Sequence, residues 1–493
     1  MLSPTIRHAM GLTRAMDERY LWADALCIVQ DDVQETRHQL LLMGKLYASA
    51  TFTIVCTDGD GSEGIPGIQG ISHPRNLYQV AFPLFASSEK VTIQDEGMNC
   101  YYPSTPSNYF RRAWTFQEYA LSKRRLIVGK KTFHWICPSA AFCESTVSFD
   151  TRNNHLHEGQ YLSLIRNTLS GRPCLKEFER VVRDYNGRNH SFPEDALAGV
   201  TGILEILSRS FEGGFIYGMP VMYFHTALMW SNVRPELAER RRHSGKDHSI
   251  LQGSCLPSWS WLGWKDANIN FNGNDGRLED NSEVTVGIVQ WSSHESATPS
   301  NLRPVGPSFP STILDDTLKR GLAQGWTSQK SNRSNRKSKS SMVGDVVFQH
   351  SSMPGSLFWG WFPIKEHQSD LRPVTPPQHA FLSCKARRGW FRVEQKRRSL
   401  GSKNFEVFDM HEKYCGWLQL ILWPKVKELP CRDSGQSQLV ELVATCIQKR
   451  GYTNYGVLCI KWEDGVAYRK GVGGIYSEAW ESHDLEDVDL ILG

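Results

Sequence analysis

The spacing of apolar residues predicts a regular series of elements in the first part of the chain. Residues 4–16 carry apolar positions at helical spacing, and residues 20–29, YLWADALCIV, form a mostly apolar run typical of a buried strand. Residues 33–48 again show a helical apolar stripe, with Asp32 as the expected N-cap. TFTIVC at 51–56 is rich in β-branched and aromatic residues and predicts a second buried strand. Strand, helix and strand with short links indicate a βαβ unit and therefore a parallel sheet.

The rest of the chain alternates between helical and extended patterns. A short helix is expected over 113–121, and it is followed by strands at 124–129 and 131–136. Helical spacing returns between about 190 and 235, including 219–230. Further strands are expected at 356–362, 379–384, 417–423 and 456–462. Asp464-Gly465 is a hairpin signal directly after the last of these strands.

A basic, low-complexity stretch interrupts this C-terminal part. TSQKSNRSNRKSKSS at 327–341 contains five Lys or Arg among fifteen residues and no acidic residue. Such a composition predicts a disordered insertion. A nuclear-localisation or nucleic-acid-binding tail is the alternative, and we favour it less because no aromatic residue is present to stack on a base.

Composition places the chain among globular, multi-domain proteins. Its 493 residues exceed one ordinary core, and 40% are hydrophobic and 22% charged. A net charge of +4 is too balanced to indicate nucleic acid as a partner. No apolar run reaches the ~20 residues that span a bilayer, and the 12 cysteines form no CxxC pair. We therefore expect a cytoplasmic protein with reduced thiols, no membrane partner and no metal site.

Common catalytic and cofactor motifs are absent from the sequence. It contains no GxGxxG after a strand, no GxxxxGK[ST], no GxSxG and no HExxH. The sequence therefore predicts no bound cofactor. This leaves two dense segments that mix aromatic, acidic and amide residues, one around 20–55 and one at 111–126.

These two segments carry a family resemblance. The two segments resemble the fungal heterokaryon incompatibility (HET) family: YLWADALCIVQDD with MGKLYASATFTIV, and RRAWTFQEYALSKRRL. Three later stretches share this resemblance: FPEDALAGVTGIL, LPSWSWLGW and the ending GVLCIKWEDGVAYRKGVGGIYSEAWE. The resemblance runs from about residue 4 to the C-terminus. It implies a HET domain at 1–147, a helical region with a Trp-rich end at 148–265, and a β-rich region at 266–493 that holds the disordered insertion.

The resemblance also implies a fold and a role. The expected fold class is α/β: a TIR-like parallel-sheet HET domain joined to a mixed α+β C-terminal region. Members usually begin with a segment similar to A-L-S-Y-x-W-G, which is not found here, so we expect a domain that is incomplete at its N-terminus. The implied role is signalling in non-self recognition and programmed cell death, through protein partners and self-association. The alternative is a TIR-like NAD hydrolase, with NAD as substrate only, whose activity the truncation and Gln39 could each remove.

Two glutamates are the candidate catalytic residues of this alternative. Glu35 and Gln39 lie four apart on the predicted helix 33–48 and so share a face. Many relatives carry Glu at the position of Gln39, and an amide cannot act as a general base. Catalysis would be lost if Gln39 is the reacting position, and retained if Glu35 or Glu118 is.

Further polar and aromatic residues are candidates for binding. They are Trp22, Asp24, Gln30, Asp31, Arg112, Trp114 and Gln117. A buried carboxylate is costly without a partner, so Asp24 is expected either to bond to the backbone or to belong to a site, where Arg112 could pair with it. Arg112 and Glu118 are six apart, and a continuous helix would turn them away from each other. The alternative interpretation is that the tryptophans pack in the core and that Gln117 and Glu118 are solvated helix residues.

Overall fold

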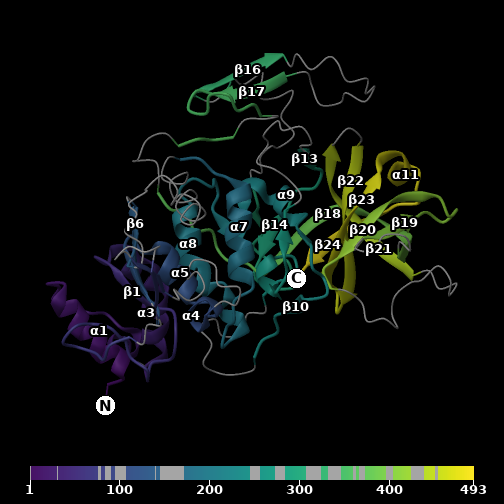
Figure 1. Ribbon diagram of the computed structural model, residues 1–493. Coiled ribbons are helices and arrows are strands. Elements are labelled where there is room, and N and C mark those ends of the chain that lie inside the picture. Colours follow the sequence, from purple (N-terminus) through teal and green to yellow (C-terminus); the bar gives the residue numbers. More distant parts are fainter. Residues whose placement is uncertain are drawn as a thin grey trace. The chain divides into compact units, whose positions relative to one another are not determined.

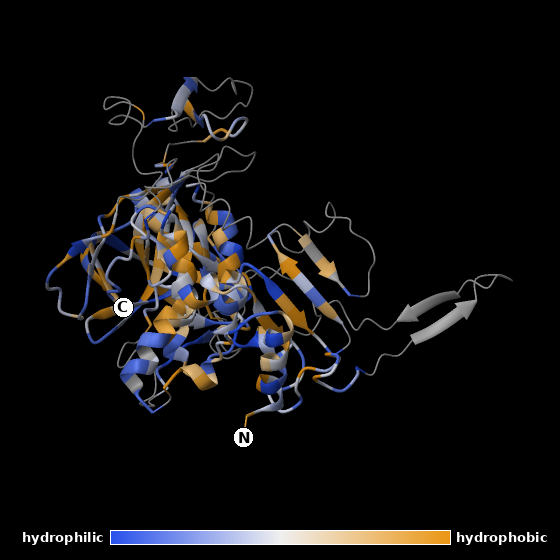
Figure 2. Cartoon of the chain, turned by 90° about the vertical axis from the view of Figure 1, so that its left-hand side faces the viewer, coloured by the Kyte–Doolittle hydropathy of each residue, from blue (hydrophilic) through white to orange (hydrophobic). Residues whose placement is uncertain are grey.

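The computed structural model separates the chain into two compact units. The first comprises 1–162, 188–203 and 246–252, and the second comprises 163–187, 204–245 and 253–493. The structure describes residues 2–29, 31–75, 79–83, 90–94, 107–130, 132–138, 140–144, 171–244, 256–271, 284–306, 322, 324–330, 346–358, 362–365, 372–395, 404–422, 438–449 and 453–493. Figure 1 labels their helices and strands, and Figure 2 shows hydrophobic and hydrophilic residues alternating along them.

The first unit combines short helices with a small sheet. Its elements are α1 (Pro4–Ala15), α2 (Asp24–Cys27), α3 (Val33–Ser49), β1 (Thr53–Cys56), β2 (Gln79–Pro83), β3 (Lys90–Gln94), α4 (Asn108–Arg111), α5 (Thr115–Leu121), β4 (Arg125–Val128), β5 (Phe133–Cys137), β6 (Ala140–Cys143), a 3-10 turn (Pro193–Ala196) and the start of α8 (Ala198–Leu207). The predicted helices at 4–16, 33–48 and 113–121 and the strands at 51–56, 124–129 and 131–136 are confirmed within a few residues.

The sheet of this unit is mixed rather than wholly parallel. Its order is β1-β4-β5-β6. β1 and β4 run parallel, with Thr53 opposite Arg125, whereas β4, β5 and β6 pair antiparallel. The parallel crossover therefore exists, but it joins β1 to β4 and passes through α5.

The prediction of a strand at residues 20–29 is wrong. Its centre is the short helix α2, and Tyr20, Leu26 and Val29 are 83%, 51% and 50% exposed. The carboxylate of Asp24 accepts the backbone N–H of Ala25 at 2.8 Å, which favours a turn at this point over an extended chain. An apolar run alone does not distinguish a strand from a short helix.

Helix α3 has an N-cap at its start and packs closely against α8 near its end. The Asp32 carboxylate accepts the N–H groups of Gln34 and Glu35 at 2.9 and 3.0 Å, so the predicted N-cap is confirmed. Further along, a Cβ on Gly44 would lie 2.9 Å from the Cα of Gly202 in α8. The two helices thus approach at a pair of glycines, because neither position has room for a side chain.

The second unit is built mainly from strands. Its elements are α7 (Leu175–Asn186), the end of α8, β7 (Phe215–Ile216), β8 (Met219–Pro220), a 3-10 turn (Val221–Tyr223), α9 (Phe224–Leu228), β9 (Ser231–Asn232), β10 (Glu239–Arg240), a 3-10 turn (Trp261–Gly263), β11 (Trp264–Lys265), β12 (Ile269–Asn270), β13 (Val284–Gly287), β14 (Ser292–His294), β15 (Arg303–Pro304), β16 (Trp326–Lys330), β17 (Val346–His350), β18 (Phe381–Gln395), β19 (Phe405–Phe408), β20 (Tyr414–Leu420), β21 (Gln438–Lys449), β22 (Thr453–Glu463), β23 (Val466–Tyr476), α11 (Ser477–Glu481) and β24 (Glu486–Leu492).

The large sheet of this unit closes on itself. The long strand β18 pairs with β21 along one edge and with β19 along the other, and β22, β23 and β20 complete the ring in antiparallel order. Its interior holds apolar side chains such as Phe391, Leu418 and Val457, so it is a packed core. β22 and β23 are joined by the predicted hairpin at Asp464 and Gly465, whose φ angles are 51° and 79°. Figure 1 shows these strands in green to yellow.

Other expectations for the second unit are met only in part. The helix expected at 219–230 is a 3-10 turn followed by the five-residue α9. At 356–362 the described residues form only an isolated bridge, Phe348 to Phe358. The insertion at 327–341 is not wholly disordered, because 327–330 belong to β16 and pair with β17 through backbone hydrogen bonds; its remaining residues lie outside the described ones. Among the helices that the structure describes, none is long and apolar enough to cross a membrane.

Candidate functional site

A pocket of about 810 Å³ lies within the first unit. It is lined by α1, by the segment that leads into α2, by the C-terminal turn of α3, by β1 and the glycine-containing loop after it, and by α4 and α5. This volume is within the range of sites that bind small molecules.

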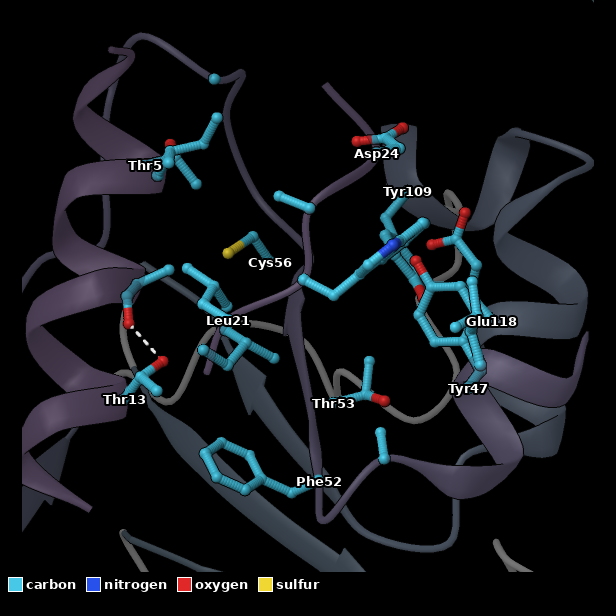
Figure 3. Close-up of a pocket in the computed structure, with 18 of the residues that line it drawn as sticks. Thr5, Thr13, Leu21, Asp24, Tyr47, Phe52, Thr53, Cys56, Tyr109 and Glu118 are labelled. Atoms are coloured by element: carbon cyan, nitrogen blue, oxygen red, sulfur yellow. Dashed lines mark hydrogen bonds between the residues drawn. The ribbon is translucent and has the colours of Figure 1, made fainter. Parts of the chain in front are cut away.

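Polar and charged groups gather at one side of this pocket. This polar side consists of Asp24 from α2, Tyr47 from α3, Tyr109 from α4, Glu118 from α5, and Arg112 from the link between α4 and α5. Figure 3 shows Asp24, Tyr47, Tyr109 and Glu118 close together, opposite Thr5 and Thr13 of α1. Asp24 and Arg112 are exposed, and Glu118 is half-buried. The polar side therefore has a charged rim and a more enclosed carboxyl group.

Glu118 is a pocket residue whose carboxyl group has a raised pKa. Burial, reinforced by the negative charge of Asp24, raises the pKa of Glu118 to about 7. The charges of Arg112 and Arg188 and the hydrogen bond from Tyr47 act in the opposite direction and limit this rise. A carboxyl group with a pKa near neutrality exists in both protonation states at physiological pH, which suits a general acid or base.

Two tyrosines lie beside this carboxyl group, and a tryptophan packs against one of them. The hydroxyl of Tyr47 donates a hydrogen bond to Glu118, and burial raises the pKa values of Tyr47 and Tyr109. The hydroxyl oxygen of Tyr109 is buried and has no hydrogen-bond partner among the described residues. The ring of Trp22 meets that of Tyr47 edge-on, with centroids 5.7 Å apart and planes at 81°.

The position of Arg112 follows from a break between two helices. Arg112 has extended backbone angles, and its neighbours Arg111 and Ala113 pair with Asn189 through backbone hydrogen bonds of 2.6 and 2.9 Å. The guanidinium of Arg188 donates a hydrogen bond to the Arg112 carbonyl at 3.4 Å. The chain therefore turns between α4 and α5, and this turn brings Arg112 to the same pocket as Glu118.

Four of the residues predicted from the sequence meet at the pocket: Trp22, Asp24, Arg112 and Glu118. The prediction that Arg112 and Glu118 point apart is wrong, because it assumed one continuous helix through both. The charge of Arg112 in fact acts on the Glu118 carboxyl.

The other predicted site residues lie elsewhere. Glu35 is outside the pocket lining, and its carboxylate accepts a hydrogen bond from Gln39 at 2.6 Å. Asp31 is exposed and Trp114 is half-buried, and neither lines the pocket. Gln117 is buried, and a Cβ on Gly202 would lie 2.9 Å from its Oε1. Gln30 lies outside the described residues.

Tyr47, Tyr109 and Arg188 are functional residues that the sequence did not predict. Tyr47 falls within the apolar stripe predicted for residues 33–48, where its hydroxyl gives no separate signal. Arg188 is 76 residues from Arg112 in sequence, so only the fold brings the two together.

Cys56 is the one thiol among the described residues that line the pocket. Burial raises the pKa of the Cys56 thiol to about 11, so it remains protonated at neutral pH. Among the residues that the structure describes, no group of three or more His, Cys, Asp or Glu side chains could hold a metal ion. Within this part of the chain, the acid–base chemistry of the pocket rests on its carboxyl and hydroxyl groups.

Comparison with known proteins finds a family match in the N-terminal part of the first unit. The family model described as Heterokaryon incompatibility protein (HET) matches residues 1–118. No curated protein and no solved structure matches the chain. Every described residue that lines the pocket falls within the matched range. Residues 1–118 of this chain are thus a heterokaryon incompatibility (HET) domain.

Proposed function

We infer that this chain is a signalling protein of the fungal heterokaryon incompatibility response and that occupancy of the HET-domain pocket controls its signal. The HET match connects the chain to heterokaryon incompatibility. The observation that carries the proposal is that the matched residues by themselves form a pocket of small-molecule size with a perturbed carboxyl group. In this proposal the protein acts in the cytoplasm, and self-association and protein partners pass the signal on to programmed cell death.

The environment of Glu118 supports a second candidate function, a TIR-like NAD hydrolase. In such a reaction the bond between the ribose C1′ and the pyridinium nitrogen breaks, and neutral nicotinamide leaves with the electron pair. Water adds to C1′ and loses a proton, which an ionised Glu118 would accept. A carboxylate beside the sugar would also stabilise the positive charge that develops on the ring. NAD is a substrate in this proposal, and no bound cofactor is required.

One expression experiment separates these functions. Wild type, Glu118→Gln and Glu35→Gln are expressed in a fungal host to equal soluble levels, and viability and cellular NAD are measured. Glu35→Gln is the matched control, because it makes the same chemical change in the same domain outside the pocket.

Each outcome decides between the candidates. The signalling proposal predicts death with wild type and Glu35→Gln, survival with Glu118→Gln, and NAD that does not fall before viability is lost. The hydrolase predicts that NAD falls first and that Glu118→Gln alone prevents the fall. Survival with the wild type at full soluble expression would contradict both.

A further inference from the structure

We propose that the HET-domain pocket binds a small organic cation that also carries a carboxamide or hydroxyl group. The binding groups are two carboxylates and three aromatic rings at one side of the pocket: Asp24, Glu118, Trp22, Tyr47 and Tyr109. This inference rests on the proposed function in one respect only, that the pocket is the working site.

The charges that line the pocket favour a positive ligand. Among the described lining residues five are acidic and one is basic: Glu18, Asp24, Asp58, Asp60 and Glu118 against Arg112. A cleft lined mainly by one sign of charge concentrates ligands of the opposite sign. Sites for phosphate groups are normally supplied with Arg, Lys or the N-terminus of a long helix. Phosphate groups placed next to these five carboxylates would therefore be repelled.

The aromatic residues supply a surface that suits an organic cation. The planes of Trp22 and Tyr47 are nearly perpendicular, so the two rings form a corner rather than a stack. A cation within about 6 Å of a Trp or Tyr ring face is attracted by the ring quadrupole, and enclosed groups of such rings bind quaternary ammonium ions. Carboxylates beside the rings add a direct charge interaction, which is strongest at the half-buried Glu118.

The Tyr109 hydroxyl indicates a further feature of the ligand. Its oxygen is buried and has no hydrogen-bond partner among the described residues, although its residue lines the pocket. A buried hydroxyl without a partner costs free energy, which a ligand group that accepts or donates a hydrogen bond would recover. A carboxamide or a hydroxyl on the cation meets this need.

The test uses three ligands with nearly the same ring and different charges. Calorimetry with the full chain at pH 8 compares 1-methylnicotinamide, a cation, with neutral nicotinamide and anionic nicotinate. We expect the cation to bind at least about tenfold more tightly than nicotinamide. A difference of this size matches the affinity that cation–π and carboxylate interactions usually contribute. Nicotinate should bind most weakly. Equal affinities, tighter binding of nicotinate, or no heat with any ligand up to about 10 mM would each overturn the inference.

Variants test whether the binding is at the proposed place. Glu118→Gln should weaken 1-methylnicotinamide binding about tenfold, and Asp24→Asn should weaken it less because Asp24 is exposed and screened by solvent. Glu35→Gln should leave the affinity unchanged. Native chromatography of each variant shows whether it is folded. A cation preference that survives both pocket variants in folded protein would contradict the assignment.

The pH dependence gives a signature that a structural effect would not produce. The titratable groups that act on Glu118 or feel its charge are Asp24, Tyr47, Tyr109, Arg112 and Arg188, and its pKa is about 7. A bound cation favours the ionised carboxyl, so affinity for 1-methylnicotinamide should rise several-fold from one pH unit below this pKa to one unit above it. Glu118→Gln should flatten the profile. An affinity that falls over this interval would overturn the inference.

The two proposals can fail separately. If Glu118→Gln abolishes cell death but the three ligands bind alike, the ligand class is wrong and the signalling role stands. If the cation binds as expected but the wild type causes no death, the signalling role is wrong and the ligand class stands.

Discussion

Replacing Glu118 by Gln should stabilise the HET domain in a pH-dependent manner. Burial is the main reason that the pKa of this carboxyl is raised to about 7, so the native state resists its ionisation. The amide of Gln has nearly the same shape, and its oxygen can still accept the hydrogen bond from Tyr47, but it carries no charge to bury. The substitution therefore removes the ionisation penalty and little else.

The size and the pH window of this effect follow from the two pKa values. The carboxyl titrates near its ordinary value of 4.5 in the unfolded chain and near 7 in the native one. Between these values the unfolded state releases its proton first, so wild-type stability falls as the pH rises. At about 1.4 kcal/mol per pKa unit the loss approaches ~3 kcal/mol, and we take about 2 kcal/mol because Glu118 retains partial contact with solvent. Glu118→Gln should equal wild type near pH 4.5 and exceed its stability by this amount above pH 7.

Native-state hydrogen exchange in dilute urea can measure this difference locally. Because the chain has two units, peptides from α3 and α5 report on the first, and peptides from β22 provide an internal reference in the second. Glu35→Gln should show no such trend, because its carboxylate lies outside the pocket. A stability difference that is constant between pH 5 and 8, or that favours wild type at high pH, would refute the reasoning about Glu118.

Three further predictions concern the framework. Gly202→Ala would place a methyl group about 3 Å from the backbone of α3 and should destabilise the first unit by ~2 kcal/mol. The control Gly61→Ala has open space around it and should cost under ~1 kcal/mol of stability. Hydrogen exchange of peptides from α3 measures both effects. Asp32→Ala removes the carboxylate that accepts two N–H groups at the start of α3, and it should lower the stability of the first unit by about 1 kcal/mol. Asp31→Ala is the control and should leave both the stability and the helicity, measured by circular dichroism, unchanged. Gly465→Ala should weaken the β22–β23 hairpin by about 1–2 kcal/mol. The reason is the φ of 79° at Gly465, which disfavours a Cβ even though the surrounding space is empty. An unchanged hydrogen-exchange rate in β22 would contradict this prediction.

Elements with local signals were predictable from the sequence. The N-cap at Asp32 and the hairpin at Asp464 and Gly465 depend on neighbouring residues alone, and the structure has both. The run YLWADALCIV was not decided locally, because its apolar composition suits a buried strand and a short helix equally. The mixed direction of the sheet was likewise invisible, since pairing is set by contacts between distant strands.

The candidate site was predictable in its members more than in its geometry. Trp22, Asp24, Arg112 and Glu118 stand out as polar or aromatic residues in apolar surroundings, and the structure places all four at one pocket. Spacing could not show that the backbone turns at Arg112, nor that Tyr47 hydrogen-bonds to Glu118. It also could not separate Glu118 from Glu35, because that difference is one of burial and tertiary position.

The most direct test of the central claim, that the HET-domain pocket is the working site, is a viability measurement. Fungal cells expressing Glu118→Gln are compared with cells expressing Glu35→Gln at equal soluble protein. We predict that Glu35→Gln kills as the wild type does and that Glu118→Gln spares the cells. Equal killing by the two variants, with both folded, would contradict the assignment of the pocket as the functional site.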